Sequence, residues 1–318
     1  NPDSQKTIEN GLGLVLMLGL AYSASIGGVG TLIGTPPNIV FAGFYKNLFP
    51  DNPEISFFQW MMLAVPIVIV FIPLVWVYLC RFVSPVPLKN ISAGSHEIIQ
   101  QELDDLGSMN HAEKIVAGVF CLTAFLWIFR KPILMGEFVI PGWSGLFAHP
   151  KYLHDSTVAM AMGVLLLIFP VNGIKGLDLH GKREYFALDW NTVQSKVPWG
   201  ILILFGGGFA LASGFGASGL DKWIGDKLTG VAGWPLWLMV LVVCLSVTFL
   251  TELTSNTATT TMILPILGLS AVAVNIHPLL FMVPATLAAS FAFMLPVATP
   301  PNAIVFGSGW VGVPQMSR

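Results

Sequence analysis

Apolar residues fall into long runs separated by shorter polar or glycine-rich stretches. The longer runs cover residues 11–26, 57–83, 113–129, 155–171, 198–213, 234–250, 258–274 and 277–293. A helix needs about twenty apolar residues to cross the hydrocarbon core of a bilayer. The pattern therefore predicts an all-α polytopic membrane protein, in which several runs are too short for a complete crossing.

The composition supports this prediction. The chain is 54% hydrophobic and 10% charged, with a mean hydropathy of +0.75. A soluble domain carries about a quarter charged residues, so we expect a multi-pass protein of the cell inner membrane or plasma membrane, with the lipid bilayer as its surroundings. The net charge of −2 gives no reason to expect a nucleic-acid partner.

The tetrapeptide Thr-Pro-Pro-Asn occurs twice inside apolar sequence, at residues 35–38 and 299–302. Paired prolines remove two backbone donors, and their rings clash with the preceding helical turn. At membrane depth such a break survives only where it lines a cavity or is buried in protein. Broken helices in two halves of a membrane protein mark the binding site of many secondary transporters. The repeat therefore predicts two broken helices around a binding site.

A second polar interruption, residues 251–257, lies between the apolar runs 234–250 and 258–274. Its short second arm favours a re-entrant hairpin over a second full crossing. Around the breaks and this turn the polar side chains are neutral hydroxyls and carboxamides, apart from Glu252. Such oxygens suit an alkali or alkaline-earth cation. Half-helices that begin at Asn38, Thr257 and Asn302 would point free amides and positive dipole ends at an anion.

Simpler interpretations exist for these residues. Single Ser and Thr side chains in membrane helices usually bond their own backbone or a neighbouring helix. A carboxylate such as Glu252 is costly in an apolar segment. It could carry a proton, bind a cation or stabilise the hairpin, and the last role is slightly favoured. The run Gly206-Gly207-Gly208 is better explained by close packing or bending than by a phosphate cradle.

Three stretches make the chain similar to a known family. These are Ser255-Asn256-Thr257, the segment from Ser23 to Asn38, and the segment 289–305 with the second Thr-Pro-Pro-Asn. They resemble the divalent anion/sodium symporter family, and most closely its bacterial sodium/dicarboxylate members. The resemblance covers essentially the whole chain. It implies a homodimer with an inverted repeat, a scaffold domain, and a transport domain that moves by an elevator mechanism.

The resemblance also implies site residues. Substrate carboxylates would contact Ser255, Asn256, Thr257, Thr299, Pro300, Thr35 and Pro36. The coupling ion Na+ would bind in two sites, the first including the carbonyl of Gly34 and the second formed by Thr251, Asn256 and Ala298. The substrate would be a small dicarboxylate anion, most simply a C4-dicarboxylate such as succinate.

The chain departs from the family pattern near its start. Ser255 precedes Thr299 by 44 residues, and the same spacing before Thr35 falls outside the sequence. We therefore expect a fragment truncated at both ends, with one complete sodium site and half of the other. Residues 1–83 and 234–318 would supply transport-domain parts, and residues 84–233 the connecting loop and scaffold helices.

Several alternatives remain open at this point. A sodium-independent dicarboxylate exchanger, or a citrate or sulfate carrier, would share these motifs. An inactive fragment is another alternative. An intramembrane enzyme using Glu252 is the least favoured, because the sequence offers no second catalytic group at the same depth, so we expect a transporter and no enzyme.

Overall fold

The computed structural model describes residues 2–83, 95–135, 138–171, 186–197, 199–220, 223 and 233–317. The chain forms two compact units. The first is built from residues 1–55, 59–86 and 200–318, and the second from residues 56–58 and 87–199. The first unit thus combines the two ends of the sequence, which carry both Thr-Pro-Pro-Asn segments.

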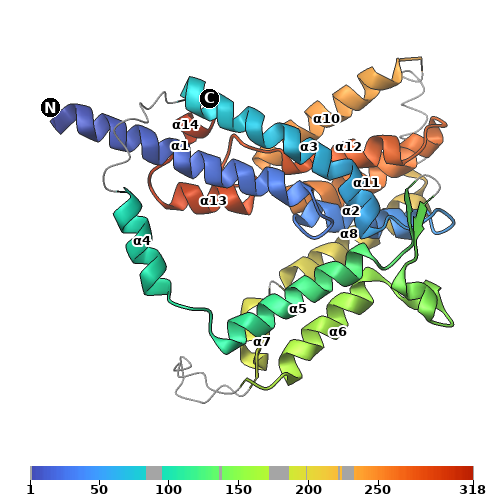
Figure 1. Ribbon diagram of the computed structural model, residues 1–318. Coiled ribbons are helices and arrows are strands. Elements are labelled where there is room, and N and C mark those ends of the chain that lie inside the picture. The colour runs from blue at the N-terminus through green and yellow to red at the C-terminus, as the bar shows by residue number, and fades with distance from the viewer. Residues whose placement is uncertain are drawn as a thin grey trace. The chain divides into compact units, whose positions relative to one another are not determined.

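The first unit consists of helices (Figure 1). They are α1 (Pro2–Val29), α2 (Pro36–Leu48), α3 (Phe57–Tyr78, from Gln59 onwards) with the π-helical turn η1 (Leu79–Val83), α8 (Gly200–Ser218), α10 (Leu236–Leu253), α11 (Asn256–Ala273), α12 (Leu279–Ser290), α13 (Pro300–Gly307) and α14 (Val313–Met316). Helix α3 continues through Pro66 and Pro73. Helices α2, α8, α10 and α12 all pack against α11, and α13 packs against α1.

The second unit contains a helical pair and a small β-hairpin. Its elements are α4 (Ser95–Leu106), α5 (His111–Ile128), β1 (Ile133–Met135), β2 (Phe138–Ile140), the 3-10 turns η3 (Trp143–Leu146) and η4 (Pro150–Tyr152), α6 (Asp155–Ile168) and α7 (Trp190–Lys196). Helices α5 and α6 pack together. The buried Arg130 joins their ends, since its Nε donates to Asp155 Oδ1 at 2.5 Å and its Nη1 to the Leu153 carbonyl at 2.7 Å.

The hairpin corrects the expectation of a purely helical chain. Strands β1 and β2 pair antiparallel, with Ile133 opposite Ile140 and Met135 opposite Phe138. Branched and aromatic residues favour such pairing, but three-residue strands inside a glycine- and proline-rich stretch leave no periodic signal. Outside the helical pair, α7 begins at the cap Asp189, where hydrogen bonds from Thr192 hold the pKa of the carboxyl below its usual value.

Within the described residues, five helices are long and apolar enough to cross a membrane. They are Gly11–Val29, Phe57–Val83, His111–Ile128, Leu236–Leu253 and Asn256–Ala273. Large apolar side chains such as Ile69, Trp76 and Phe82 are exposed on the second of these spans. Soluble proteins rarely expose extended apolar surface, and lipid solvates it. The structure is therefore that of a mostly helical, polytopic membrane protein.

Close packing against α11 depends on one glycine of the Gly206-Gly207-Gly208 run. A Cβ atom at Gly208 would overlap the Thr261 side chain and would lie 2.9 Å from Phe44 Cζ. At Gly206 and Gly207 nothing lies within 4 Å of the same position. The close-packing interpretation of this run is thus confirmed for Gly208, which lets α8 approach α11.

Candidate functional site

The first Thr-Pro-Pro-Asn segment breaks a helix between Val29, the end of α1, and Pro36, the start of α2. Thr35 is extended, with φ −145° and ψ 143°. The buried Asn38 holds the break together, because its Nδ2 donates to the carbonyls of Val29 (3.2 Å) and Thr31 (2.8 Å). These are carbonyls that the interrupted helix cannot satisfy.

Two glycines permit the chain to double back at this break. A Cβ atom at Gly28 would lie 2.7 Å from the Gly34 carbonyl oxygen, and a Cβ at Gly34 would overlap the Gly28 backbone. Backbone approach this close excludes any side chain at either position. The carbonyl of Gly34 is therefore held at a fixed place beside the end of α1.

The second segment has the same local geometry. Helix α12 ends at Ser290 and α13 begins at Pro300, with Thr299 extended at φ −139° and ψ 149°. The buried Asn302 donates from Nδ2 to the carbonyls of Ala292 (3.0 Å) and Leu295 (3.1 Å). Both breaks thus use the asparagine of the motif to cap the unpaired carbonyls of the preceding segment.

The expected helix starts at Asn38 and Asn302 are wrong by two residues. Helices α2 and α13 begin at Pro36 and Pro300, since the fixed φ of proline suits the first turn of a helix. Prolines have no N–H, and the Asn38 N–H donates to the Thr35 carbonyl at 3.2 Å. Each of these helix ends keeps its dipole but presents fewer free amides than expected.

The polar turn between α10 and α11 touches the second break. The Asn256 N–H, the first amide of α11, donates to the carbonyl of Ala298 at 3.0 Å. The hydroxyl of Thr257 donates to Asn256 Oδ1 at 3.2 Å. The hydroxyls of Thr254 and Thr259 are hydrogen-bonded to each other and close the turn. Helix α11 starts at Asn256, one residue before the expected Thr257.

The structure brings most of the expected site residues into one unit. Thr251 is buried on the last turns of α10, and its hydroxyl donates to the Ala289 carbonyl at 3.3 Å. Asn256, Thr257, Ala298 and Thr299 are buried, and Ser255 and Pro300 are exposed. Thr35 and Pro36 lie at the start of α2, which packs against α11. Among the described residues, no hydrogen bond joins Gly34 to the turn at residues 254–257.

Four buried side-chain oxygens at the breaks have no hydrogen-bond partner among the described residues. They are Ser25 Oγ, Asn38 Oδ1, Thr299 Oγ1 and Asn302 Oδ1. Unpartnered buried acceptors are rare in folded proteins, and all four are hard oxygens of the kind that alkali cations prefer. The described residues contain no cluster of three His, Cys, Asp or Glu side chains that could hold a metal ion.

Comparison with known proteins identifies the family. Residues 1–318 match the model of the sodium:sulfate symporter transmembrane region. The chain belongs to this symporter family. It is 47% identical over 302 residues to the sodium-dependent dicarboxylate transporter SdcS of Staphylococcus saprophyticus, and 45% identical to SdcS of Staphylococcus aureus strain NCTC 8325. Each alignment covers 95% of this chain and 54% of the relative.

The chain thus spans about half the length of the curated relatives it matches. Both relatives are named as transporters. A catalytic role for Glu252 has no support in the family.

In this symporter-family chain, Glu252 has a clear structural partner. Its side chain is buried, and its carboxylate accepts three consecutive backbone N–H groups beyond the end of α12. Oε1 accepts from Phe293 (2.8 Å) and Met294 (3.0 Å), and Oε2 from Met294 (3.1 Å) and Leu295 (2.9 Å). Successive backbone amides form a concave anion site. Glu252 therefore fixes the chain just before the second break, in agreement with the structural role that was slightly favoured.

The two asparagines of the motif do more than the sequence predicted. The sequence analysis placed helix starts at Asn38 and Asn302 and counted their carboxamides among the neutral oxygens at the breaks, but it did not predict that they cap the preceding carbonyls. A signal was present, because a carboxamide repeated at the same place in both breaks can cap carbonyls with Nδ2 while Oδ1 remains free.

Proposed function

We propose that this protein carries out sodium-coupled transport of small dicarboxylates, with C4-dicarboxylates such as succinate as the substrate class. The observation that carries the proposal is the hydrogen bond from the Asn256 N–H to the Ala298 carbonyl. It ties the tip of the α10–α11 hairpin to the second broken helix. The names of the SdcS relatives supply the ion and the substrate class.

We assign the second sodium site to Thr251, Asn256 and Ala298, and part of a first site to the Gly34 carbonyl. The oxygens are neutral and hard, which suits Na+ better than a transition metal. The carbonyl oxygen of Ala298 accepts one hydrogen bond, from Asn256, and a carbonyl can serve a second partner. The unpartnered Thr299 Oγ1 lies next to Ala298 in the chain and fits this polar environment.

We assign the substrate carboxylates to Ser255, Asn256 and Thr257 at the hairpin tip. At the breaks, Thr35 and Pro36 would contact them from one side and Thr299 and Pro300 from the other. The start of α11 contributes the positive end of its dipole. Because Asn256 belongs to both sets, sodium that orders the tip raises the affinity for the anion, which is the coupling that a symporter requires.

The larger architecture belongs to the same proposal. The α10–α11 pair would act as a re-entrant hairpin, and the two breaks would be related as inverted repeats. Residues 1–83 and 234–318 would move as transport-domain parts against the scaffold helices of residues 84–233, by an elevator motion in a homodimer. The matching capping of Asn38 and Asn302 supports the repeat.

The test is counterflow of labelled succinate into proteoliposomes, with sodium or with potassium. We expect uptake by the unchanged chain only in sodium, and a fall to background for Asn256→Ala. The matched control is Asn191→Ala, which alters an exposed residue of α7. Sodium-dependent uptake that survives in Asn256→Ala would contradict the site, and uptake that is equal in potassium would contradict sodium coupling.

Competition in the same assay separates the substrate alternatives. We expect unlabelled succinate to abolish the signal, and equal concentrations of sulfate or citrate to leave most of it. Stronger competition by sulfate or citrate than by succinate would show that the protein is a carrier of that anion instead. Exchange that persists without sodium on either side would identify a sodium-independent exchanger.

A further inference from the structure

A cavity of about 670 Å³ lies in the first unit, away from the residues assigned to transport. Its lining comes from α2 from Phe41 onwards, the loop before α3, the first turns of α3, His277 and the first turns of α12. Ligand cavities commonly measure about 300–1,000 Å³. None of the residues of the two Thr-Pro-Pro-Asn segments or of the hairpin tip lines it, so it needs an explanation of its own.

One wall of the cavity is a rigid aromatic surface. Phe41 contacts Tyr45 and Trp60, with ring centroids 6.0 and 5.4 Å away. The Trp60 indole is fixed, since its Nε1 donates to the Val29 carbonyl at 2.9 Å. All three rings are almost fully buried. The rings thus make this wall rigid, and the accessible apolar surface of the cavity comes from other side chains.

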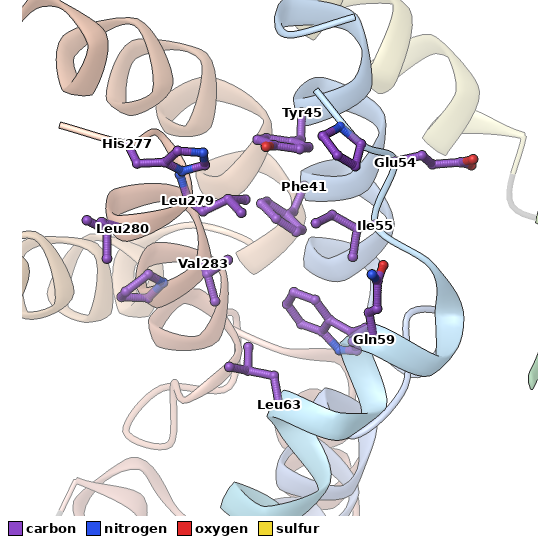
Figure 2. Close-up of a pocket in the computed structure, with 13 residues that line it drawn as sticks. Phe41, Tyr45, Glu54, Ile55, Gln59, Leu63, His277, Leu279, Leu280 and Val283 are labelled. Atoms are coloured by element: carbon purple, nitrogen blue, oxygen red, sulfur yellow. The ribbon is translucent and has the colours of Figure 1, made fainter. Parts of the chain in front are cut away.

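The opposite side and the rim are aliphatic. Val283 lies across from Phe41, and Leu63 and Leu280 lie near the edge (Figure 2). Leu63 and Leu280 are 47% and 43% exposed. Leu63 belongs to α3, which is long and apolar enough to cross a membrane, and Leu280 belongs to the shorter apolar helix α12. Exposed apolar surface of this kind suits an acyl chain better than a polar solute.

Two hydrogen-bond donors lie at one end of the cavity. Figure 2 shows the hydroxyl end of Tyr45 and the ring of His277 turned toward each other, with Phe41, Val283 and Leu63 beyond them. Tyr45 is only 3% exposed, yet its hydroxyl has no hydrogen-bond partner among the described residues. His277 Nδ1 accepts the Leu279 N–H at 3.3 Å. Nε2 therefore carries the proton in the neutral ring and is free to donate.

The two donors at this end of the cavity suit a ligand group with several hydrogen-bond acceptors. The carboxylate of Glu54, the acidic residue of the lining, is directed away from Phe41 and Val283 (Figure 2). An anionic group beside Tyr45 and His277 would thus meet two donors and no carboxylate. We propose that the cavity binds a glycerophospholipid, with its phosphate at Tyr45 Oη and His277 Nε2 and one acyl chain along Leu63, Leu280 and Val283.

The test measures lipid binding by native mass spectrometry of the purified chain in detergent. The probes are palmitoyl-oleoyl phosphatidylglycerol, dioleoylglycerol, which has no phosphate, and inorganic phosphate. The double variant Tyr45→Phe/His277→Asn removes both donors, and the asparagine oxygen still replaces Nδ1 as the acceptor for Leu279. Its control is Tyr152→Phe/His149→Asn, which alters an exposed contact pair of the second unit.

We expect the double variant to bind phosphatidylglycerol about tenfold more weakly, the loss expected for two hydrogen bonds. Dioleoylglycerol binding should not change, and the control should behave as the unchanged chain. Val283→Trp, which fills the cavity, should lose both lipids while thermal unfolding shows that it folds. Equal phosphatidylglycerol binding by the double variant and its control would overturn the proposal. Unchanged binding by Val283→Trp, or displacement of the lipid by inorganic phosphate, would do so as well.

Discussion

At the scale of single residues, Glu252 shows how a carboxylate can be accommodated in an apolar segment. Its two oxygens accept the N–H groups of residues 293–295, so backbone donors replace the water that would otherwise surround the side chain. Those donors belong to the stretch between α12 and Ala298. The position of the Ala298 carbonyl, which we propose as a sodium ligand, therefore depends on a side chain outside the proposed site.

This leads to a prediction for Glu252→Gln. The new amide would place a donor against backbone donors and would leave one or more of them unpaired, so we expect a loss of about 2–4 kcal/mol in the free energy of unfolding. Sodium should also bind more weakly. The measurement is thermal unfolding in detergent over a sodium titration, with Glu102→Gln on the exposed face of α4 as the control.

A different outcome would favour another role. If Glu252 carried a proton during transport, Glu252→Gln would leave thermal stability unchanged and remove the pH dependence of uptake. Stability equal to that of the Glu102 control would contradict the backbone-anchoring role.

At the scale of elements, the packing of α8 against α11 depends on the absence of a side chain at Gly208. Gly207→Ala and Gly208→Ala make the same chemical change one residue apart. The first adds a methyl group into open space, and the second drives it into Thr261 and Phe44. Alanine is a better helix former than glycine by about 1 kcal/mol. The free energy of unfolding should therefore fall only in Gly208→Ala, where the added methyl group has no room.

We expect Gly207→Ala to be neutral or stabilising and Gly208→Ala to destabilise by about 1–3 kcal/mol, the usual cost of overpacking. Thermal unfolding of both variants under identical conditions measures the difference. Equal stability of the two would show that α8 does not pack tightly on α11.

At the scale of the whole molecule, the proposed function requires that sodium and anion binding reinforce each other. Ligands that bind only the folded state stabilise it, on the order of 3 kcal/mol at a hundred times Kd. We expect sodium alone to raise the unfolding temperature, and succinate to raise it further in sodium but not in potassium. By reciprocity, succinate should increase the apparent affinity for sodium.

The control for this prediction is Asn256→Ala, which should unfold at a temperature independent of both ligands because Asn256 belongs to both proposed sites. Succinate that stabilises the unchanged chain equally in potassium would contradict the coupling. A succinate effect that persists in Asn256→Ala would instead contradict the assignment of the site to the hairpin tip.

The predictions from the sequence succeeded where the physics is local. The length of an apolar run decides whether a helix can cross a membrane, and the described spans lie on predicted runs, although Asn256–Ala273 is long enough to cross where a short re-entrant arm was expected. Two adjacent prolines cannot continue the helical turn before them, so both breaks lie directly before the motif prolines, whereas the separated Pro66 and Pro73 leave α3 continuous. The β-hairpin at Ile133–Ile140 was missed because its short strands leave no period to detect.

The sequence by itself thus determined that the chain spans a membrane, where its helices break and which family it belongs to. Only the tertiary structure decided that Asn256 reaches Ala298, that Glu252 holds the backbone about forty residues further along, and that Tyr45 and His277 share one cavity. The physical reason is the range of the interactions. Helix breaks and spans depend on neighbouring residues, whereas these contacts exist only after α2, α3, α10, α11 and α12 have packed together.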